Sequence, residues 1–143
     1  MTEEAYVEPA IEPLLVLTVQ TTLVRAVTDT PLGGRMIFDV VGGTFSGPRL
    51  KGNVPATGGD WVTRTAAGSR LDVRLLLETD DGVSILLQYS GRASQNNGKP
   101  RIEIAGAFEA PAGTYGWLND VQTFGLGVPF DGGVKYRLYR FKS

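Results

Sequence analysis

The sequence predicts an all-β fold: a single closed or nearly closed antiparallel β-barrel of about 8 to 10 strands around a central cavity. Short apolar or alternating runs recur along the chain, and turn residues close each run. No window of helical length keeps the apolar spacing of an amphipathic helix. Several runs are apolar on both faces, which suits a barrel that has an interior and no exposed strand edge. We therefore expect a barrel rather than a sandwich.

One domain is expected over residues 14–143, preceded by a flexible N-terminal arm over residues 1–13, where Pro9 and Pro13 interrupt regular structure. A chain of 143 residues is long enough to bury a core of its own. The expected strands, in chain order, are 14–26, 35–41, 44–54, 60–66, 71–79, 83–91, 101–110, 121–128 and 134–141.

Local patterns support these elements. Leu, Val and Thr dominate the first run, and alternation places Met36 and Phe38 on one face of the second. The Asp-Asp-Gly sequence at 80–82 is a strong hairpin signal between two apolar runs. The segment 92–100 is rich in Gln, Asn and Gly and is typical of an exposed, mobile loop. A single helical turn is expected near Trp117.

A glycine-rich run over residues 42–61 contains six glycines and two prolines. Glycine allows positive φ and close backbone approach, whereas proline fixes φ, so this run cannot form a helix. We interpret it as a pair of strands with tight corners that brings Asp60 and Trp61 to one spot. The run is therefore the first place to look for a site.

The composition excludes several classes of chemistry. The chain has no cysteine and no histidine, which rules out disulfides, thiolate nucleophiles, Ser-His-Asp triads and zinc sites built on these residues. An all-oxygen calcium or magnesium site would need an Asp-rich loop, and the chain has none. We expect no metal and no cofactor, so catalysis would depend on carboxylates, Tyr, Lys, Arg, Ser, Thr or backbone amides.

Charge and hydropathy limit the partners. The 14 basic and 15 acidic residues are mixed along the chain, for a net charge of −1, so we expect neither nucleic acid nor a membrane as a partner. The first apolar run, residues 14–17, is too short for a secretion signal or a membrane span. We expect a cytoplasmic protein that binds a small hydrophobic or aromatic molecule, and a homodimer is a candidate assembly.

Three charged residues are candidates for catalysis. Asp60 precedes an indole, where partial burial would raise its pKa and suit it to acid–base work, but it could equally accept hydrogen bonds from the glycine turn. Asp39 lies in an apolar strand, where an ion pair is the simpler interpretation. Arg74 shares a strand face with Asp72. If that face points inward, the two residues form a buried ion pair or Arg74 binds an anionic ligand, and if it points outward they are solvated surface charges. We favour an inward Arg74, although the parity is ambiguous.

Mainly aromatic and amide side chains are the candidates for substrate binding, because small-molecule sites combine apolar walls with a few polar groups. The candidates are Trp61, Asp72, Tyr89, Tyr115, Trp117 and Asn119. The tryptophans would supply walls, although core packing suits Trp117 better, and the tyrosines and the amide would donate hydrogen bonds to a carbonyl or oxyanion. Tyr136 and Tyr139 occupy opposite strand faces, so at most one of them faces the cavity.

Six motifs occur in an order that resembles one protein family. They are TPLGGR at 30–35, GGTFSGPRLKG at 42–52, GGDW at 58–61, LDVR at 71–74, ETDDG at 78–82 and YGWLN at 115–119. Together they resemble the bacterial and fungal family called domain of unknown function 3237, over residues 14–141. The resemblance implies a lipocalin-like or allene-oxide-cyclase-like barrel with an interior pocket near the Gly-Asp-Trp and Trp-Leu-Asn segments.

Two departures from the family pattern concern the pocket. Leu75 stands where the family often has an aromatic residue, typically tyrosine, so an inward Leu75 would make this pocket more apolar. The loop at 92–100 is shorter than in relatives, which would change the mouth of the pocket.

Three functional hypotheses follow. The first is a cofactor-independent enzyme of the cyclase, isomerase or lyase type that acts on an activated carbonyl compound (an enone, a phenolic or a polyketide-like molecule). The second is a non-catalytic, lipocalin-like carrier or sensor of a small hydrophobic ligand, and the third is an interaction module without a ligand. An enzyme predicts polar groups that converge on the cavity with a perturbed carboxylate, a carrier predicts an apolar cavity with an open mouth, and a module predicts a filled barrel.

Overall fold

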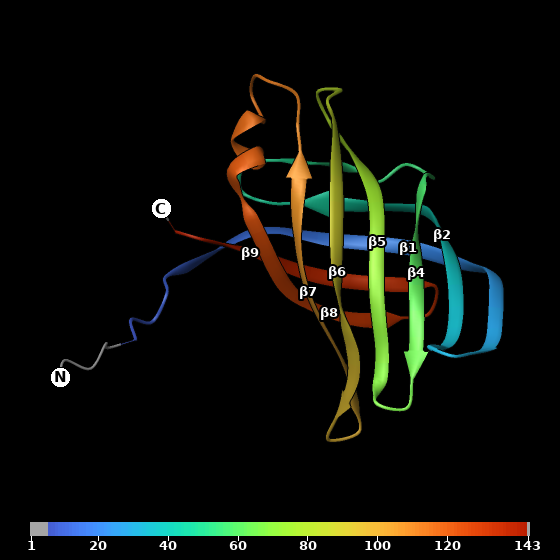
Figure 1. The fold of residues 1–143 in the computed structure, drawn as a ribbon. Helices are drawn as coiled ribbons and strands as arrows, with labels where there is room; N and C mark the ends of the chain where they lie inside the picture. The colour runs from blue at the N-terminus through green and yellow to red at the C-terminus, as the bar shows by residue number, and fades with distance from the viewer. Residues whose placement is uncertain (1–5, 143) are drawn as a thin grey trace.

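The computed structural model describes residues 6–142, and within them the predicted antiparallel barrel is confirmed (Figure 1). The elements are β1 (Ile11–Thr30), β2 (Gly33–Ser46), β3 (Lys51–Asn53), β4 (Gly58–Thr65), β5 (Gly68–Thr79), β6 (Ser84–Asn96), β7 (Lys99–Glu109), the 3-10 helix η1 (Gly116–Asp120), β8 (Gln122–Phe130) and β9 (Gly133–Phe141). Of the 9 strands, 8 close into a ring in the order β1–β9–β8–β7–β6–β5–β4–β2, and β2 pairs again with β1. The short strand β3 pairs with both β2 and β5.

The first strand begins earlier than expected. β1 starts at Ile11, because its first half pairs with β9 from Ile11↔Phe141 onward. Pro13 is accommodated at a register shift between Pro13 and Leu15, as strand prolines commonly are. Residues 6–10 carry no strand and are exposed. The rest of the expected arm, residues 1–5, lies outside the described residues.

The prediction of a mobile loop at 92–100 is wrong. β6 and β7 continue through this segment as a paired ribbon up to Asn96↔Lys99. Asn97 (φ 52°) and Gly98 (φ 77°) form a two-residue turn with positive φ at both positions, which is the geometry that suits the twist of a hairpin. The Asn-Gly pair was the correct signal, and the polar composition around it was misleading.

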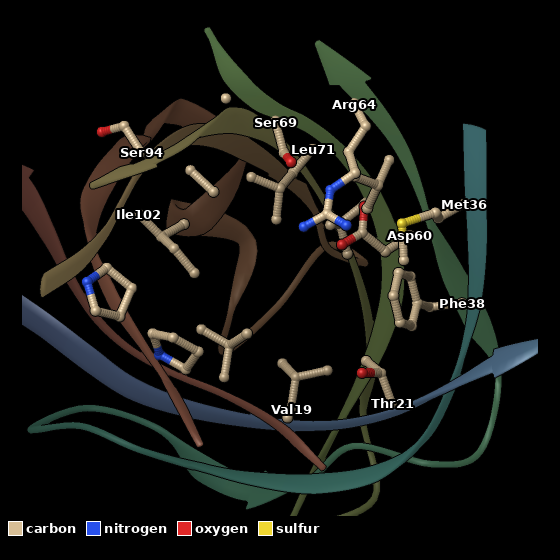
Figure 2. Close-up of a pocket in the computed structure, with 18 of the residues that line it drawn as sticks. Val19, Thr21, Met36, Phe38, Asp60, Arg64, Ser69, Leu71, Ser94 and Ile102 are labelled. Atoms are coloured by element: carbon tan, nitrogen blue, oxygen red, sulfur yellow. The ribbon is translucent and has the colours of Figure 1, made fainter. Parts of the chain in front are cut away.

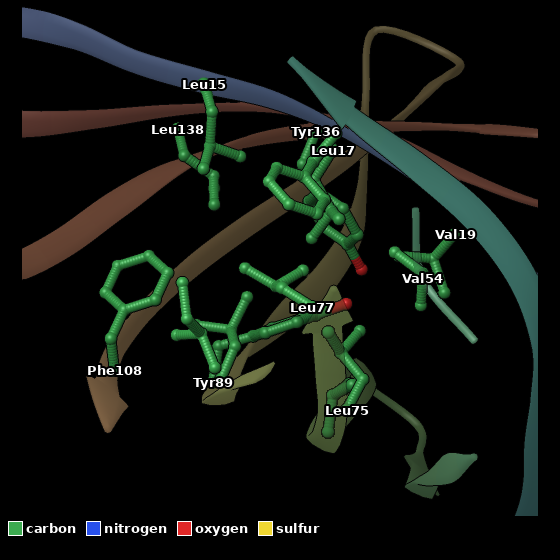
Figure 3. Packing of buried hydrophobic residues seen from close by; sticks show 14 of the residues in the cluster. Leu15, Leu17, Val19, Val54, Leu75, Leu77, Tyr89, Phe108, Tyr136 and Leu138 are labelled. Atoms are coloured by element: carbon green, nitrogen blue, oxygen red, sulfur yellow. The ribbon is translucent and has the colours of Figure 1, made fainter. Parts of the chain in front are cut away.

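One end of the barrel is filled with apolar side chains (Figure 3). Six aliphatic residues there are at most 1 % exposed: Leu17, Leu77, Ile85, Leu87, Leu118 and Leu138. Leu118 comes from η1, the helical turn expected near Trp117, so this turn closes the end of the barrel that the hairpin between β5 and β6 also borders. No helix in residues 6–142 is long and apolar enough to cross a membrane.

Candidate functional site

The other end of the barrel is hollow. A cavity of about 810 Å³ opens between the turns that join β4 to β5, β6 to β7 and β8 to β9 (Figure 2). Most of its wall is apolar and comes from inward side chains of six strands: Val19, Met36, Phe38, Val62, Leu71, Val73, Ile102 and Val134.

The cavity exists because inward side chains shrink toward this end. Along β6 the inward positions from the closed end are Ile85, Leu87, Tyr89, Gly91 and Ala93, so large side chains give way to a glycine and an alanine before Gln95 at the mouth. β5 changes in the same direction, from leucines near η1 to a serine at the mouth. Because barrels of this size have room for little more than their own side chains, small inward residues leave space for a ligand.

Asp60 is the acidic residue of the cavity wall. It lies on β4 directly opposite Phe38 of β2 and is partly buried. Burial raises the pKa of the Asp60 carboxyl to about 6, against the opposing effect of a hydrogen bond from the Asp72 N–H, while the charge of Asp72 raises it slightly further. A carboxyl with this pKa exchanges its proton near neutral pH, as a general acid or base must.

The Asp60 carboxyl is bound by a backbone N–H group that is left free at a gap in the hydrogen-bond ladder between β4 and β5. The ladder pairs Asp60 with Val73 and Thr63 with Arg70, but the two positions between them are not paired. At this gap the Asp72 N–H donates to Asp60 Oδ1 at 3.2 Å. The alternative interpretation, that Asp60 accepts a hydrogen bond from the backbone, is therefore correct, although the donor is the N–H of Asp72 and not an N–H of the glycine turn. One carboxyl oxygen is thus fixed by the backbone.

Two tyrosines form the floor of the cavity. Tyr89 of β6 and Tyr136 of β9 meet edge to face, with ring centroids 5.2 Å apart (Figure 3). Burial, with smaller contributions from Tyr136 and Asp60, raises the pKa of Tyr89 well above its ordinary value. Burial also raises the pKa of Tyr136, and the charge of Asp60 adds to it. Both hydroxyls therefore stay protonated at neutral pH and can donate hydrogen bonds.

Of the predicted site residues, only Asp60 and Tyr89 line the cavity. Trp61 is 57 % exposed on the outside of the barrel, so the expectation that it shares a spot with Asp60 is wrong. Neighbouring residues of a strand point to opposite faces, and the glycines before Asp60 do not change this. Gly58, with φ +92°, instead lets β4 start close against the backbone of β5.

The charged residues of β5 also point outward. Leu71, Val73, Leu75 and Leu77 are the buried set, so the prediction of an inward Arg74 is wrong, and Asp72 is exposed with it. Asp39 is exposed on the outer face of β2. Leu75 does point inward, but it lies in the filled half and not in the wall of the cavity, so it does not make the pocket more apolar.

Three further candidates hold the closed end together and do not line the cavity. The Tyr115 hydroxyl donates to Asp81 Oδ1 at 2.8 Å. Asn119 clamps Ala110 through two hydrogen bonds, accepting from its N–H at 2.8 Å and donating to its carbonyl at 2.9 Å. The Trp117 ring lies under the Arg49 guanidinium, 3.8 Å from its centroid, and packs against the core. These contacts stabilise the closed end of the barrel.

Tyr136 and Arg64 are among the polar residues of the cavity that sequence reasoning missed. Tyr136 was considered only as one of a pair, and it is the inward member while Tyr139 is not. Arg64 was not considered, yet it follows Asp60 and Val62 on the same face of β4 and lines the mouth. The alternation 60, 62, 64 was the available signal. Within residues 6–142 no three His, Cys, Asp or Glu side chains are grouped so that they could hold a metal ion.

A family model described as "Protein of unknown function (DUF3237)" matches residues 9–141. The chain belongs to this family. No curated protein is similar to it in sequence.

Solved structures share the DUF3237 barrel. A β-barrel-like protein from Acinetobacter baumannii AYE is 30 % identical, with a TM-score of 0.86 over 96 % of this chain and 100 % of that one. A conserved protein of unknown function from Rhodopseudomonas palustris is 17 % identical, with a TM-score of 0.88 over 96 % and 100 %. An enzyme from Penicillium herquei is 24 % identical, with a TM-score of 0.77 over 99 % and 100 %. The fold is therefore common to proteins from bacteria and a fungus.

Proposed function

We propose that this DUF3237 protein is a cofactor-independent enzyme that transfers a proton on a small activated carbonyl compound held in the barrel cavity. The observation that carries the proposal is Asp60, a carboxyl in the cavity wall whose pKa is raised to about 6. Perturbed carboxyls in clefts are characteristic of acid–base sites. The structural likeness to an enzyme from Penicillium herquei is compatible with a catalytic role.

In the proposed reaction Asp60 acts as the base and then as the acid. Its carboxylate removes a proton from the carbon next to the carbonyl group, and an enolate forms. Tyr89 and Tyr136, which remain protonated, donate hydrogen bonds to the enolate oxygen. Protonated Asp60 then returns the proton to another atom of the substrate. In a cyclisation the enolate carbon attacks a second carbonyl group of the same molecule, and the alkoxide formed there takes the proton. In an elimination the enolate expels a leaving group, which takes the proton. Isomerisation, cyclisation and elimination all share this first step.

The apolar wall would supply orientation. Phe38 and Leu71 are among its members, and an apolar wall packs a substrate without competing for the polar groups that act on it. Holding the substrate against a fixed carboxyl converts an encounter into an intramolecular step. Arg74, Asp39, Tyr115 and Asn119 have no part in this proposal, because none of them lines the cavity.

A second candidate function is a carrier or sensor of a small hydrophobic molecule. It is favoured by the same wall, most of which is apolar, and by the open mouth of the cavity. An interaction module without a ligand would need a filled barrel, and a cavity of about 810 Å³ argues against it.

Deuterium exchange distinguishes the enzyme from the carrier. The probe is 2-tetralone, an aromatic ketone with acidic protons next to its carbonyl, and NMR follows their replacement in D₂O. We expect the wild-type protein to accelerate exchange over buffer and Asp60→Asn to lose about 100-fold or more of that acceleration, which is the usual contribution of a general base. Tyr136→Phe should lose about 100-fold, the usual cost of removing one oxyanion donor while another remains.

The matched control is Asp39→Asn, which neutralises an exposed carboxylate on the outer face of β2. It should exchange at the wild-type rate. Wild-type exchange in Asp60→Asn would rule out the proposed role of this carboxyl. Binding of 2-tetralone without any exchange by the wild-type protein would favour the carrier.

A further inference from the structure

Arg64 is the basic residue of the cavity wall. It lies at the end of β4, four positions after Asp60 on the same inward face. Figure 2 shows its side chain at the mouth with the guanidinium turned over the cavity, on the side where Asp60, Met36 and Phe38 lie. Four residues of strand advance by roughly 13 Å, so the two charged groups are attached at different depths of the cavity.

Arg64 has no ionic partner among residues 6–142. The ion pairs there join Lys51 to Asp80, Arg101 to Glu103 and Arg140 to Glu12, all outside the cavity. Asp60 lies on the same wall, yet its oxygens are beyond 4.0 Å of the guanidinium and its titration is governed by burial and by Asp72. Arg64 is therefore a cation without a counter-ion, directed at a space that a ligand can enter.

The surroundings of Arg64 define what that ligand should be. Met36, Phe38, Leu71 and Ile102 give the space below the mouth an apolar wall, which suits a flat aromatic body. A guanidinium presents several donors in one plane and matches the paired oxygens of an anionic group better than any neutral acceptor. An aromatic molecule with an anionic oxygen group at one end satisfies both features.

We propose that Arg64 selects aromatic substrates that carry an anionic group with paired oxygens, such as a carboxylate, and anchors that group at the mouth while the reacting carbonyl lies between Asp60 and the two tyrosines. This inference rests on the proposed function, because it names the substrate class of the same cavity. Arg64 is a specificity-determining residue in this arrangement and takes no part in the proton transfer.

The test uses two fluorescent probes that differ in one anionic group. These are 1-anilinonaphthalene-8-sulfonate and N-phenyl-1-naphthylamine, which has the same aromatic body without the sulfonate. Fluorescence titration at neutral pH and low salt should give an affinity about 10-fold to 100-fold higher for the sulfonate, as expected for a charge-assisted contact in a partly apolar site. Arg64→Met should remove this preference and leave the uncharged probe within about twofold of wild type. Arg64→Lys should restore part of it.

The control is Arg74→Met on the outer face of β5. This arginine lines a separate surface groove together with Leu76 and Leu86, so it is the obvious rival site for an anionic aromatic probe. The proposal requires both affinities to stay unchanged in Arg74→Met. Loss of sulfonate binding in this variant, rather than in Arg64→Met, would overturn the assignment to the cavity.

Three other outcomes of the titration bear on the role of Arg64 or on the cavity. Equal affinity of the wild-type protein for the two probes, or an unchanged preference for the sulfonate in Arg64→Met, would overturn the role of Arg64 while leaving the acid–base proposal for Asp60 intact. Failure of the uncharged probe to bind the wild-type protein would contradict an aromatic ligand in the cavity and overturn this inference, whereas the exchange of 2-tetralone decides the proposed function separately. Because binding of the uncharged probe also reports a folded cavity, an unfolded Arg64→Met variant is recognised at once.

Discussion

The two ends of the barrel are built from the same strands and differ in the side chains that those strands point inward. At the closed end leucines, Ile85 and Phe108 pack beneath η1 and are almost fully buried. At the open end the same strands carry Ser69, Gly91 and Ala93, and a cavity of about 810 Å³ remains. The polar groups Asp60, Tyr89 and Tyr136 lie where the two ends meet.

This difference shows how one barrel combines stability with a site. The closed end supplies apolar burial, which is the main favourable term in folding. The open end gives up part of that burial and accepts a carboxyl whose charged form is disfavoured by its surroundings. A site placed this way costs stability locally, and the packed half offsets the cost.

The largest expected effect is at the closed end. Leu77 is 0 % exposed, and Leu77→Ala should lower the free energy of unfolding by about 2 to 5 kcal/mol, because a cavity forms in a packed region. Leu71 lines the existing cavity, and Leu71→Ala should cost only about 1 to 2 kcal/mol, because it enlarges a space that water already reaches. Urea unfolding at constant pH measures both.

The two leucine variants form a matched pair, since the deletion is chemically the same on one strand. Equal losses would mean that the open end is as tightly packed as the closed end, and the contrast between them would be void. A larger loss of unfolding free energy for Leu71→Ala than for Leu77→Ala would mean that the open end is the more tightly packed of the two.

A smaller effect is expected at the open end and depends on pH. The pKa of Asp60 is raised from 3.8 to about 6 in the folded protein, so the folded state binds this proton more tightly than the unfolded chain. The stability that this protonated carboxyl contributes is complete below the unfolded pKa and is lost as the pH rises through about 6. Asp60→Asn does not lose stability in this way, because its side chain does not titrate. Relative to wild type, it should gain at most about 3 kcal/mol in free energy of unfolding between about pH 4 and pH 7.

Urea unfolding of both proteins across this pH range gives the difference directly, and the exposed Asp39→Asn serves as its control. A difference between wild type and Asp60→Asn that does not change with pH would mean that the open end imposes no electrostatic cost on Asp60. A difference that falls as the pH rises would have the wrong sign.

The sequence was sufficient to predict the barrel fold, because each strand of a barrel can be recognised from its own apolar residues and the turn residues that follow it. Runs such as 71–79 and 83–91, closed by turn residues, gave the strands and the antiparallel order. It underestimated the hairpin around Asn97 and Gly98, because polar residues on a ribbon that extends past the core resemble a loop. Strand ends at the rim of a barrel lose the apolar alternation that identifies strands.

The site was predictable only in part. Asp60 was accessible from local sequence, but its partners were not, because Tyr89 and Tyr136 come together only through strand pairing around the ring. The errors at Trp61 and Arg74 have a different origin, namely strand parity. For Trp61, alternation alone would have separated it from Asp60. For Arg74, only the closed barrel shows which face is inside.

The measurement that bears most closely on the open end is the titration of Asp60 itself. Protein labelled with ¹³C at the aspartate carboxyl carbons is followed by NMR from about pH 3 to pH 8, and Asp60→Asn identifies the signal. Because burial in the cavity wall raises the pKa of this carboxyl, its midpoint should lie at about 6. A midpoint near 3.8, the ordinary value for an aspartate, would mean that Asp60 is a solvated surface carboxylate, and the proposed acid–base role would be lost with it.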